Sequence, residues 1–412
     1  MSREFDLILF GATGFTGRLV AEYLAKNASK PPGATTSGSE TATKWALAGR
    51  SVEKLEQIRS GLGPGGASVP IIKADSGDAK SLEAMVARTK VMCTTVGPYA
   101  KYGLPLVEAC SRAGTHYCDL TGETQFMRDS IDRCETLARD SKARIVHTAG
   151  FDSVPSDLGM QFLFEQLGPL KRATLVVEVM RGGFSGGTLA SLMVGLDEAK
   201  ADRSRRRLLG DPYALSPNRD AEPKLGNERD LTSFKFDDFT GQWIAPFVMA
   251  SVNTRVVRRA NALQNYAWGR ELRYAEVSGM KRGVRGAFRA ATMTAILGGG
   301  IGALMFGPTR KLAERFLPKP GEGPNEESRR TGRVRMRIYG ESEKGERGSV
   351  VVAGEGDPGY QLTSVILGEC ALCLAHDEAK LPQRFGVLTP STAMGPVLRE
   401  RLVRAGMTFA RG

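Results

Sequence analysis

Short apolar runs alternate with longer amphipathic segments along the first 150 residues of the chain. The runs are rich in Val, Ile, Leu and Ala, which is typical of strands buried on both faces of a parallel sheet. Six strands are predicted, at residues 5–10, 45–48, 70–74, 91–96, 115–120 and 144–149. Helices are predicted between them at residues 15–26, 51–62, 78–88, 103–112 and 126–140. Strands and helices on this schedule predict an α/β fold with a Rossmann doubly wound parallel sheet.

The rhythm changes after residue 150, where apolar and polar positions alternate between longer helices and irregular stretches. These alternating segments lie at residues 173–180, 243–251, 272–277, 334–338 and 349–353. They predict a second, α+β domain that contains an antiparallel sheet. Residues 1–150 are therefore expected to form the Rossmann domain. Within it, the Ser/Thr/Gly/Pro-rich residues 27–43 are expected to form a mobile surface loop.

Residues 290–307 carry no charged side chain and are flanked by basic residues on both sides. Their length is at the lower edge for a membrane-spanning helix, and five glycines argue against a span. A membrane-surface or lipid-channel element is the interpretation that we favour, and a buried helix is the main alternative. The flanking basic residues are Arg282, Arg285, Arg289, Arg310, Lys311 and Arg315.

The composition is that of a globular protein large enough for two domains, with 412 residues, 41% hydrophobic and 25% charged. The formal net charge of +12 favours nucleic acid, anionic lipid or an anionic substrate as a partner. Neither zinc-finger spacing nor an RNA-recognition signature accompanies this charge, so we expect no nucleic-acid partner.

Six cysteines are too few for a disulfide framework in a chain of this size, and no secretory signal is recognisable at the start. We therefore expect reduced cysteines in a cytoplasmic protein. Any peripheral contact with the inner face of the plasma membrane is expected through residues 290–307. Cys370 and Cys373 form the one close pair, in an apolar run that favours a packed helix over a metal or redox site. With only three histidines as well, no metal site is expected.

The sequence GATGFTG at residues 11–17 lies between the first predicted strand and the first predicted helix. Gly11 permits a sharp turn, Gly14 lets backbone amides approach a pyrophosphate, and Gly17 permits close packing of helix on strand. The positive end of the helix dipole then faces the phosphates. This loop predicts a dinucleotide site, whose remaining lining residues are Thr13, Phe15 and Thr16.

The second strand is followed by Arg50 and Ser51, where NAD-binding proteins usually have an acidic residue for the ribose hydroxyl. An arginine suits a 2′-phosphate, so NADP is the predicted cofactor. Asp75, after the third strand, is expected either near the adenine or as a helix cap. The fourth strand ends on Thr95, Val96, Gly97 and Pro98, which we expect beside the nicotinamide riboside.

Candidate catalytic groups are chosen by their place at predicted strand ends: Tyr99 after the fourth strand, and Asp152 and Ser153 after the sixth. Ser153 has the alternative role of capping the helix that follows. Residues 185–188, which contain two glycines at a helix start, form a further candidate anion or carbonyl site. The Tyr-x-x-x-Lys pair typical of short-chain dehydrogenases is absent.

Taken together, several blocks resemble the saccharopine dehydrogenase-like oxidoreductases, above all their mycobacterial branch of trans-acting enoyl reductases. The blocks are GATGFTG (11–17), ALAGRS (46–51), TTVGPYAKYGLPLVEAC (94–110), YCDLTGE (117–123), GFDSVPSDLG (150–159), GGFSGGTLAS (182–191), APFVMASVNTRVVRRANAL (245–263), PKPGEGP (318–324) and GVLTP (386–390). They extend over nearly the whole chain. The 27–43 loop is longer than the family pattern leads us to expect.

The resemblance implies a substrate domain at residues 151–365 and a C-terminal segment, 366–412, that packs back on the Rossmann domain. It also implies NADPH-dependent reduction of an acyl or polyketide double bond, on a chain carried by a synthase, in the synthesis of cell-wall lipids. A homodimer is compatible with it. Two alternatives stay open: a saccharopine-type dehydrogenase acting on a C–N bond, and a non-catalytic NADP-binding scaffold at a membrane.

Overall fold

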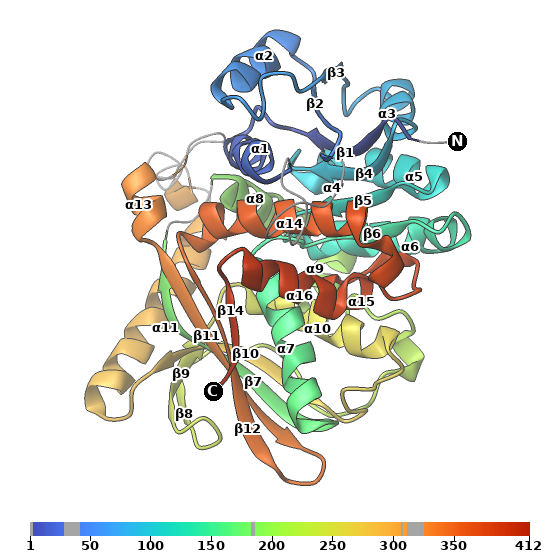
Figure 1. The fold of residues 1–412 in the computed structure, drawn as a ribbon. Helices are drawn as coiled ribbons and strands as arrows, with labels where there is room; N and C mark the ends of the chain where they lie inside the picture. The colour runs from blue at the N-terminus through green and yellow to red at the C-terminus, as the bar shows by residue number, and fades with distance from the viewer. Residues whose placement is uncertain (1–2, 29–41, 183–185, 306–307, 311–322, 324) are drawn as a thin grey trace. The chain divides into compact units, whose positions relative to one another are not determined.

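A computed structural model describes residues 3–28, 42–182, 186–305, 308–310, 323 and 325–412. The chain folds into two compact units, each built from more than one segment (Figure 1). The first unit comprises Met1–Thr121, Phe126–Phe151 and Gly359–Ala405. The second comprises Gly122–Gln125, Asp152–Pro358 and Gly406–Gly412.

The first unit is built on a parallel seven-stranded sheet of order β13-β6-β5-β4-β1-β2-β3. All six strands predicted in the first 150 residues are present, and the order of β1 to β6 is that of a Rossmann fold. The seventh comes from the C-terminal part of the chain. The strands are β1 (Phe5–Phe10), β2 (Trp45–Gly49), β3 (Ile71–Lys73), β4 (Thr89–Thr94), β5 (His116–Asp119), β6 (Arg144–Val146) and β13 (Gly386–Leu388).

The helices of the first unit include one, α14 (Thr363–His376), that is apolar on nearly every side and buried among α1, β4 and β5. A helix without a polar face gains stability only inside a core, which explains this position. The others are α1 (Phe15–Asn27), α2 (Val52–Gly61), α3 (Ala79–Val86), α4 (Tyr99–Tyr102), α5 (Leu104–Ala113), α6 (Thr124–Asp140), α15 (Pro390–Ala393) and α16 (Gly395–Arg404), with the short turns η2 (Pro358–Leu362) and η3 (Glu378–Lys380). Most of the predicted loop 27–43 lies outside the described residues.

The second unit contains a mixed seven-stranded sheet of order β14-β12-β11-β7-β10-β9-β8. Its neighbouring strands are antiparallel, as predicted, except that β7 and β10 run parallel. The strands are β7 (Leu170–Arg181), β8 (Lys235–Asp237), β9 (Gln242–Pro246), β10 (Arg273–Met280), β11 (Arg333–Ser342), β12 (Arg347–Glu355) and β14 (Thr408–Arg411).

The helices of the second unit include α7, which packs against β11 and β12 through Gly159. A Cβ at Gly159 would lie 2.6 Å from the Cδ1 of Ile338, so only glycine permits this approach. The helices are α7 (Val154–Leu167), α8 (Gly186–Ala201), α9 (Arg203–Gly210), α10 (Ala250–Leu263), α11 (Val284–Met305) and α13 (Glu326–Thr331), with the turn η1 (Arg219–Ala221).

Two sequence-based boundaries differ from the structure. Residues 243–251 were expected to alternate as one strand, but β9 ends at Pro246 and α10 begins at Ala250. A short apolar stretch does not by itself distinguish a strand from the first turn of a buried helix. The C-terminal segment 366–412 also divides: its last strand, β14, pairs with β12 in the second sheet, where it covers an otherwise open edge.

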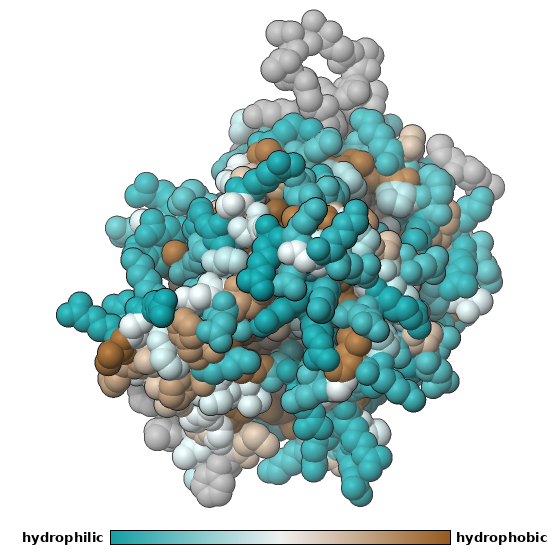
Figure 2. Space-filling view, turned by 90° about the horizontal axis from the view of Figure 1, so that it is seen from below, coloured by the Kyte–Doolittle hydropathy of each residue, from teal (hydrophilic) through white to brown (hydrophobic). Residues whose placement is uncertain are grey.

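Helix α11 is exposed along most of its length, so residues 290–305 do not form the buried helix that was the main alternative. Residues 306–307 of the predicted segment lie outside the described residues. The large apolar side chains of α11 include Phe288, 72% exposed, and Ile296, 68% exposed. It has the length and composition of a membrane-crossing helix, with a mean hydropathy of 1.3. Pale to brown side chains gather on the side of the molecule where α11 lies (Figure 2).

Candidate active site

The loop between β1 and α1 has the close backbone approaches that its three glycines predict. Gly11 has a φ of +101°, and a Cβ there would lie 2.8 Å from the Thr95 Oγ1. A Cβ at Gly17 would lie 2.2 Å from the Gly11 carbonyl oxygen, whereas one at Gly14 would meet nothing nearer than 3.5 Å. The first and third glycines therefore hold the loop together, and the second leaves open space outside it.

The start of α1 suits an anion. Gly14 is the N-cap residue and provides no side-chain cap. The amide groups and the dipole of a helix N-terminus favour a bound anion. Thr13 is exposed beside it and Thr16 is half-buried. Phe15 packs edge-on against Tyr360, with ring centroids 4.7 Å apart, which fixes the first helical residue. This geometry fits the pyrophosphate of a dinucleotide.

Arg50 follows the carboxyl end of β2 and is exposed, with no hydrogen bond or ion pair to the residues that the structure describes. Ser51 caps α2 by accepting from the Lys54 amide, and it donates to Glu53 at 2.9 Å. Asp75 lies after β3, where its carboxylate accepts from the Gly77 amide. It does not cap α3, because Asp78 has that position.

The carboxyl end of β4 lies next to the glycine loop. The Thr95 hydroxyl donates to the Gly11 carbonyl at 3.0 Å, and the Val96 amide donates to the Thr94 hydroxyl. Gly97 is exposed, and Pro98 follows it through a cis peptide bond. The predicted residues of the glycine loop and of the β4 end thus come together at one point of the sheet, where the strand order reverses between β1 and β4.

Tyr99 is only 3% exposed, and its hydroxyl bridges two strand ends. The hydroxyl donates to the Thr94 carbonyl and accepts from the Leu120 amide. Tyr99 therefore holds β4 and the segment after β5 in place. Its catalytic role stays a prediction.

A buried polar cluster lies at the ends of β5 and β6. The sequence indicated two of its members, Tyr117 and Asp119, as polar groups at a strand end, but not their partners His147 and Ser130. The His147 ring bonds the Asp119 carboxylate at 2.7 Å and the Ser130 hydroxyl at 2.8 Å. Asp119 also accepts from the Tyr117 hydroxyl and from two backbone amides. The connectivity resembles that of a hydrolase triad. Because these bonds join the ends of β5 and β6, we assign the cluster to fixing the two strand ends. Its members are far apart in sequence, which hides it from motif analysis.

Asp152 and Ser153 lie at the beginning of the second unit, just before α7. Asp152 is half-buried and Ser153 has no exposed surface. Ser153 occupies the N-cap position, but its hydroxyl makes no capping bond and instead donates to the Asn253 Oδ1 at 3.0 Å. The Ser153 side chain therefore does not cap α7, and its hydroxyl bonds the Asn253 side chain. Ser185, from the candidate anion site 185–188, lies outside the described residues.

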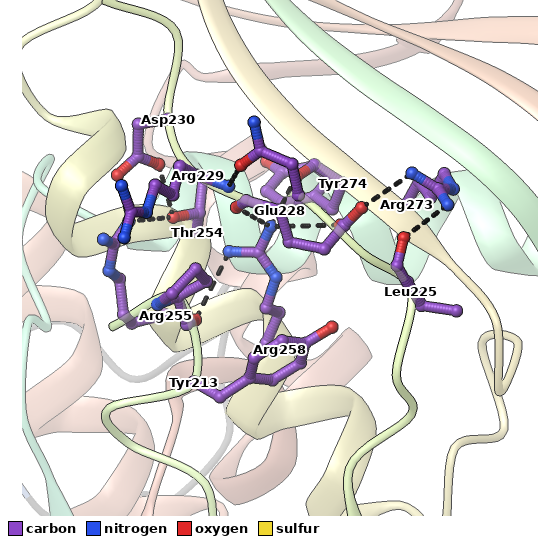
Figure 3. A network of polar contacts seen from close by, with 12 residues as sticks. Tyr213, Leu225, Glu228, Arg229, Asp230, Thr254, Arg255, Arg258, Arg273 and Tyr274 are labelled. Carbon is purple, nitrogen blue, oxygen red and sulfur yellow. Dashed lines mark hydrogen bonds and ion pairs between the residues drawn. The ribbon is translucent and has the colours of Figure 1, made fainter. Parts of the chain in front are cut away.

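Three arginines of α10, Arg255, Arg258 and Arg259, are buried although the chain is strongly basic. Arg258 donates to the carbonyls of Glu228 and Tyr274, and Arg255 pairs with Asp230 (Figure 3). These bonds fasten the segment before β8 onto α10 and β10. Burial lowers the pKa of Arg258. This part of the positive charge is therefore neutralised inside the second unit.

The cysteines are all free thiols and all buried, including the Cys370 and Cys373 pair on α14. Burial raises the pKa of Cys370 well above its ordinary value. In the described part of the chain no group of three or more His, Cys, Asp or Glu side chains is arranged to hold a metal ion.

Comparison with known proteins identifies the cofactor-binding domain and the family. Residues 7–146 match the saccharopine dehydrogenase NADP-binding domain. A Mycobacterium tuberculosis protein named as a candidate trans-acting enoyl reductase is 46% identical, over 99% of this chain and 97% of its own length. The trans-acting enoyl reductase of Mycobacterium bovis BCG is 42% identical over the same shares.

Among solved structures, apo saccharopine dehydrogenase of Saccharomyces cerevisiae aligns with 98% of this chain and 99% of its own, with a TM-score of 0.52 and 10% sequence identity. That likeness concerns the fold. The full-length identity to the mycobacterial proteins decides the family. The chain is an NADP-dependent oxidoreductase that belongs to the trans-acting enoyl reductase family of saccharopine dehydrogenase-like proteins.

Proposed function

We propose that the protein reduces the α,β-double bond of an enoyl thioester, with the acyl or polyketide chain carried by a synthase that lacks its own reductase. The observation that carries this proposal is full-length identity above 40% to a protein named trans-acting enoyl reductase, joined to an NADP-binding fold. We further propose that the product enters a cell-wall lipid of the phthiocerol or phenolic glycolipid type.

The chain's own residues have separate tasks in this reaction. When bound, NADPH would supply a hydride for the β-carbon, with negative charge developing on the thioester oxygen. The α1 N-terminus and Arg50 would hold the phosphates, and residues 95–98 would border the nicotinamide. We propose Ser153 as the hydrogen-bond donor to the developing oxyanion and Asp152 as the group that handles the α-carbon proton. Tyr99 positions the end of β4.

An assay of NADPH oxidation tests the proposal. The substrates are an enoyl thioester on a pantetheine carrier, the matching saturated thioester, and an imine formed from an amino acid and a keto acid. We expect turnover only with the enoyl thioester. Turnover with the imine alone would favour the C–N dehydrogenase alternative, and NADPH binding without turnover on either would favour the scaffold.

We also propose that the protein works in the cytoplasm and contacts the inner face of the plasma membrane through α11. The exposed apolar side chains of this helix support the proposal, as do the basic residues at its start: Lys281, Arg282, Arg285 and Arg289. Between Val284 and Met305 there is no acidic residue. An apolar helix with cationic flanks suits an anionic bilayer, where each basic residue contributes roughly 1 kcal/mol.

A further inference from the structure

A second buried polar cluster lies in the second unit, where the start of α7, the helix α10 and the strand β10 meet. Its members are at most 3% exposed. They are Ser153 and Ser156 on α7, Asn253 on α10, and Tyr274 and Glu276 on β10. The reaction proposed above uses Ser153 but gives no task to the buried carboxyl group of Glu276.

The contacts form a chain from Glu276 to Ser153. The Tyr274 hydroxyl donates to the Glu276 Oε1 at 2.8 Å, and the Asn253 Nδ2 donates to the Glu276 Oε2 at 2.9 Å. At its other end the Asn253 Oδ1 accepts from the Ser153 hydroxyl at 3.0 Å. A single amide group therefore joins the carboxyl to the serine.

The charged groups around Glu276 do not neutralise it. Asp230 lies close enough to oppose its ionisation, and Asp157 acts in the same sense on Tyr274. Two arginines of α10 bond elsewhere: Arg255 to Asp230, and Arg258 to backbone carbonyls and the Glu228 carboxylate (Figure 3).

Burial of the Glu276 carboxyl raises its pKa to about 7, against the hydrogen bonds from Asn253, Tyr274 and Ser156, which lower it. Both protonation states are therefore populated near neutral pH.

The protonation state of Glu276 dictates the direction of every bond in the chain. An ionised carboxylate only accepts, so Asn253 must turn its NH₂ toward Glu276 and its oxygen toward Ser153, which then has to donate. A protonated Glu276 can donate to the Asn253 oxygen. The amide then turns over, its NH₂ donates to Ser153, and the serine proton is released for another acceptor.

We propose that Glu276 is a positioning residue that sets, through Asn253, whether the Ser153 hydroxyl donates into the protein or toward the substrate. The effect of Glu276 on turnover rests on the proposed function, whereas the titration of its carboxyl can be measured without any turnover. If position 276 had a packing role alone, glutamine would fill it as well as glutamate, because glutamine has the same shape and no charge to desolvate.

Glu276→Gln provides the test, because its amide donates to Asn253 and so imitates the protonated carboxyl. In the wild type, kcat/KM on the enoyl thioester should fall about tenfold between pH 6 and pH 8, as expected for a group with a pKa of about 7 that is active when protonated. Glu276→Gln should be flat over that range within about twofold. Tyr274→Phe should shift the wild-type profile to higher pH, since the tyrosine bond favours the ionised form.

The matched control is Glu222→Gln, which removes another carboxyl of the second unit whose pKa is raised by burial but which bonds Ser216 instead. It should leave the wild-type profile unchanged. Identical pH profiles for wild type and Glu276→Gln would overturn the proposal.

Infrared spectroscopy follows the buried carboxyl without any turnover. A protonated-carboxyl band that disappears near pH 7 in the wild type, and is missing from Glu276→Gln, supports the proposal. No such titration would contradict it. If no enoyl thioester reacts, the proposed reaction fails, and this titration still decides the state of Glu276.

Discussion

At the scale of single residues, the three glycines of the β1–α1 loop have different tasks. Gly17→Ala should destabilise the protein by about 1–3 kcal/mol, because the new methyl group meets the Gly11 carbonyl. Gly14→Val should fold normally, since a Cβ there finds space, but should weaken NADPH binding roughly a hundredfold, or about 3 kcal/mol. Thermal unfolding and NADPH titration check the two variants. A Gly14→Val protein that binds NADPH normally would contradict the placement of the pyrophosphate.

Arg50 is the residue that we expect to choose between the two cofactors. Its exposed guanidinium at the end of β2 offers a charge-assisted bond to a 2′-phosphate, worth about 1.5–3 kcal/mol. Arg50→Glu should therefore lose ten- to a hundredfold in affinity for NADPH while affinity for NADH is kept or raised. Calorimetric titration of both cofactors measures this, with Arg59→Glu on α2 as a control. Equal affinities of the wild type for NADPH and NADH would refute the assignment.

Glu276 also has a consequence for stability. Its pKa rises from 4.5 to about 7 on folding, so the folded state holds its proton more tightly than the unfolded state. The stability that protonation contributes is complete below pH 4.5 and is lost as pH rises toward 7, by roughly 3 kcal/mol in all. Relative to the wild type, Glu276→Gln should gain stability as pH rises from 5 to 8. Denaturant unfolding at several pH values checks this, and a parallel pH dependence of both proteins would contradict it.

At the scale of elements, the sequence predicted best those features that depend on residues close together along the chain. Buried parallel strands require continuous apolar runs, so the six strands of the first unit were predictable, as was the glycine loop, whose residues are neighbours along the chain. The stretch 243–251 was not, because β9 and the first turn of α10 share one apolar pattern. The partners of Asp119 and of Glu276 lie far from them in the sequence and are brought together only by folding, so no sequence motif predicted these contacts.

Helix α11 is the element whose surface most needs an explanation. Replacing its exposed side chains in a Phe288→Glu, Ile296→Glu variant should leave the fold intact, since neither side chain is buried. We expect the wild type to co-sediment with anionic phospholipid vesicles and this variant to lose most of that binding. Val403→Glu, which changes an exposed apolar residue of α16, is the control and should bind like the wild type. Wild-type protein that stays in solution would contradict a membrane role.

At the scale of the whole molecule, family membership and the NADP-binding fold define an oxidoreductase, and the reaction is the part that we propose. Each unit carries different residues of the proposed reaction. The first carries the dinucleotide loop and the β4 end, and the second carries Asp152, Ser153 and the Glu276 cluster. Neither piece alone accounts for reduction of a double bond, so the central claim is best tested on the full chain.

The most direct measurement follows a deuterium label from the reactive hydride position of NADPH into the product. The full chain is incubated with this NADPH and a carrier-bound enoyl thioester, and the product is analysed by mass spectrometry and NMR. We predict a saturated thioester with one deuterium on the β-carbon and a solvent-derived proton on the α-carbon. An unlabelled thioester, with deuterium found instead on a carbon bonded to nitrogen when an amino acid and a keto acid are supplied, would contradict the account.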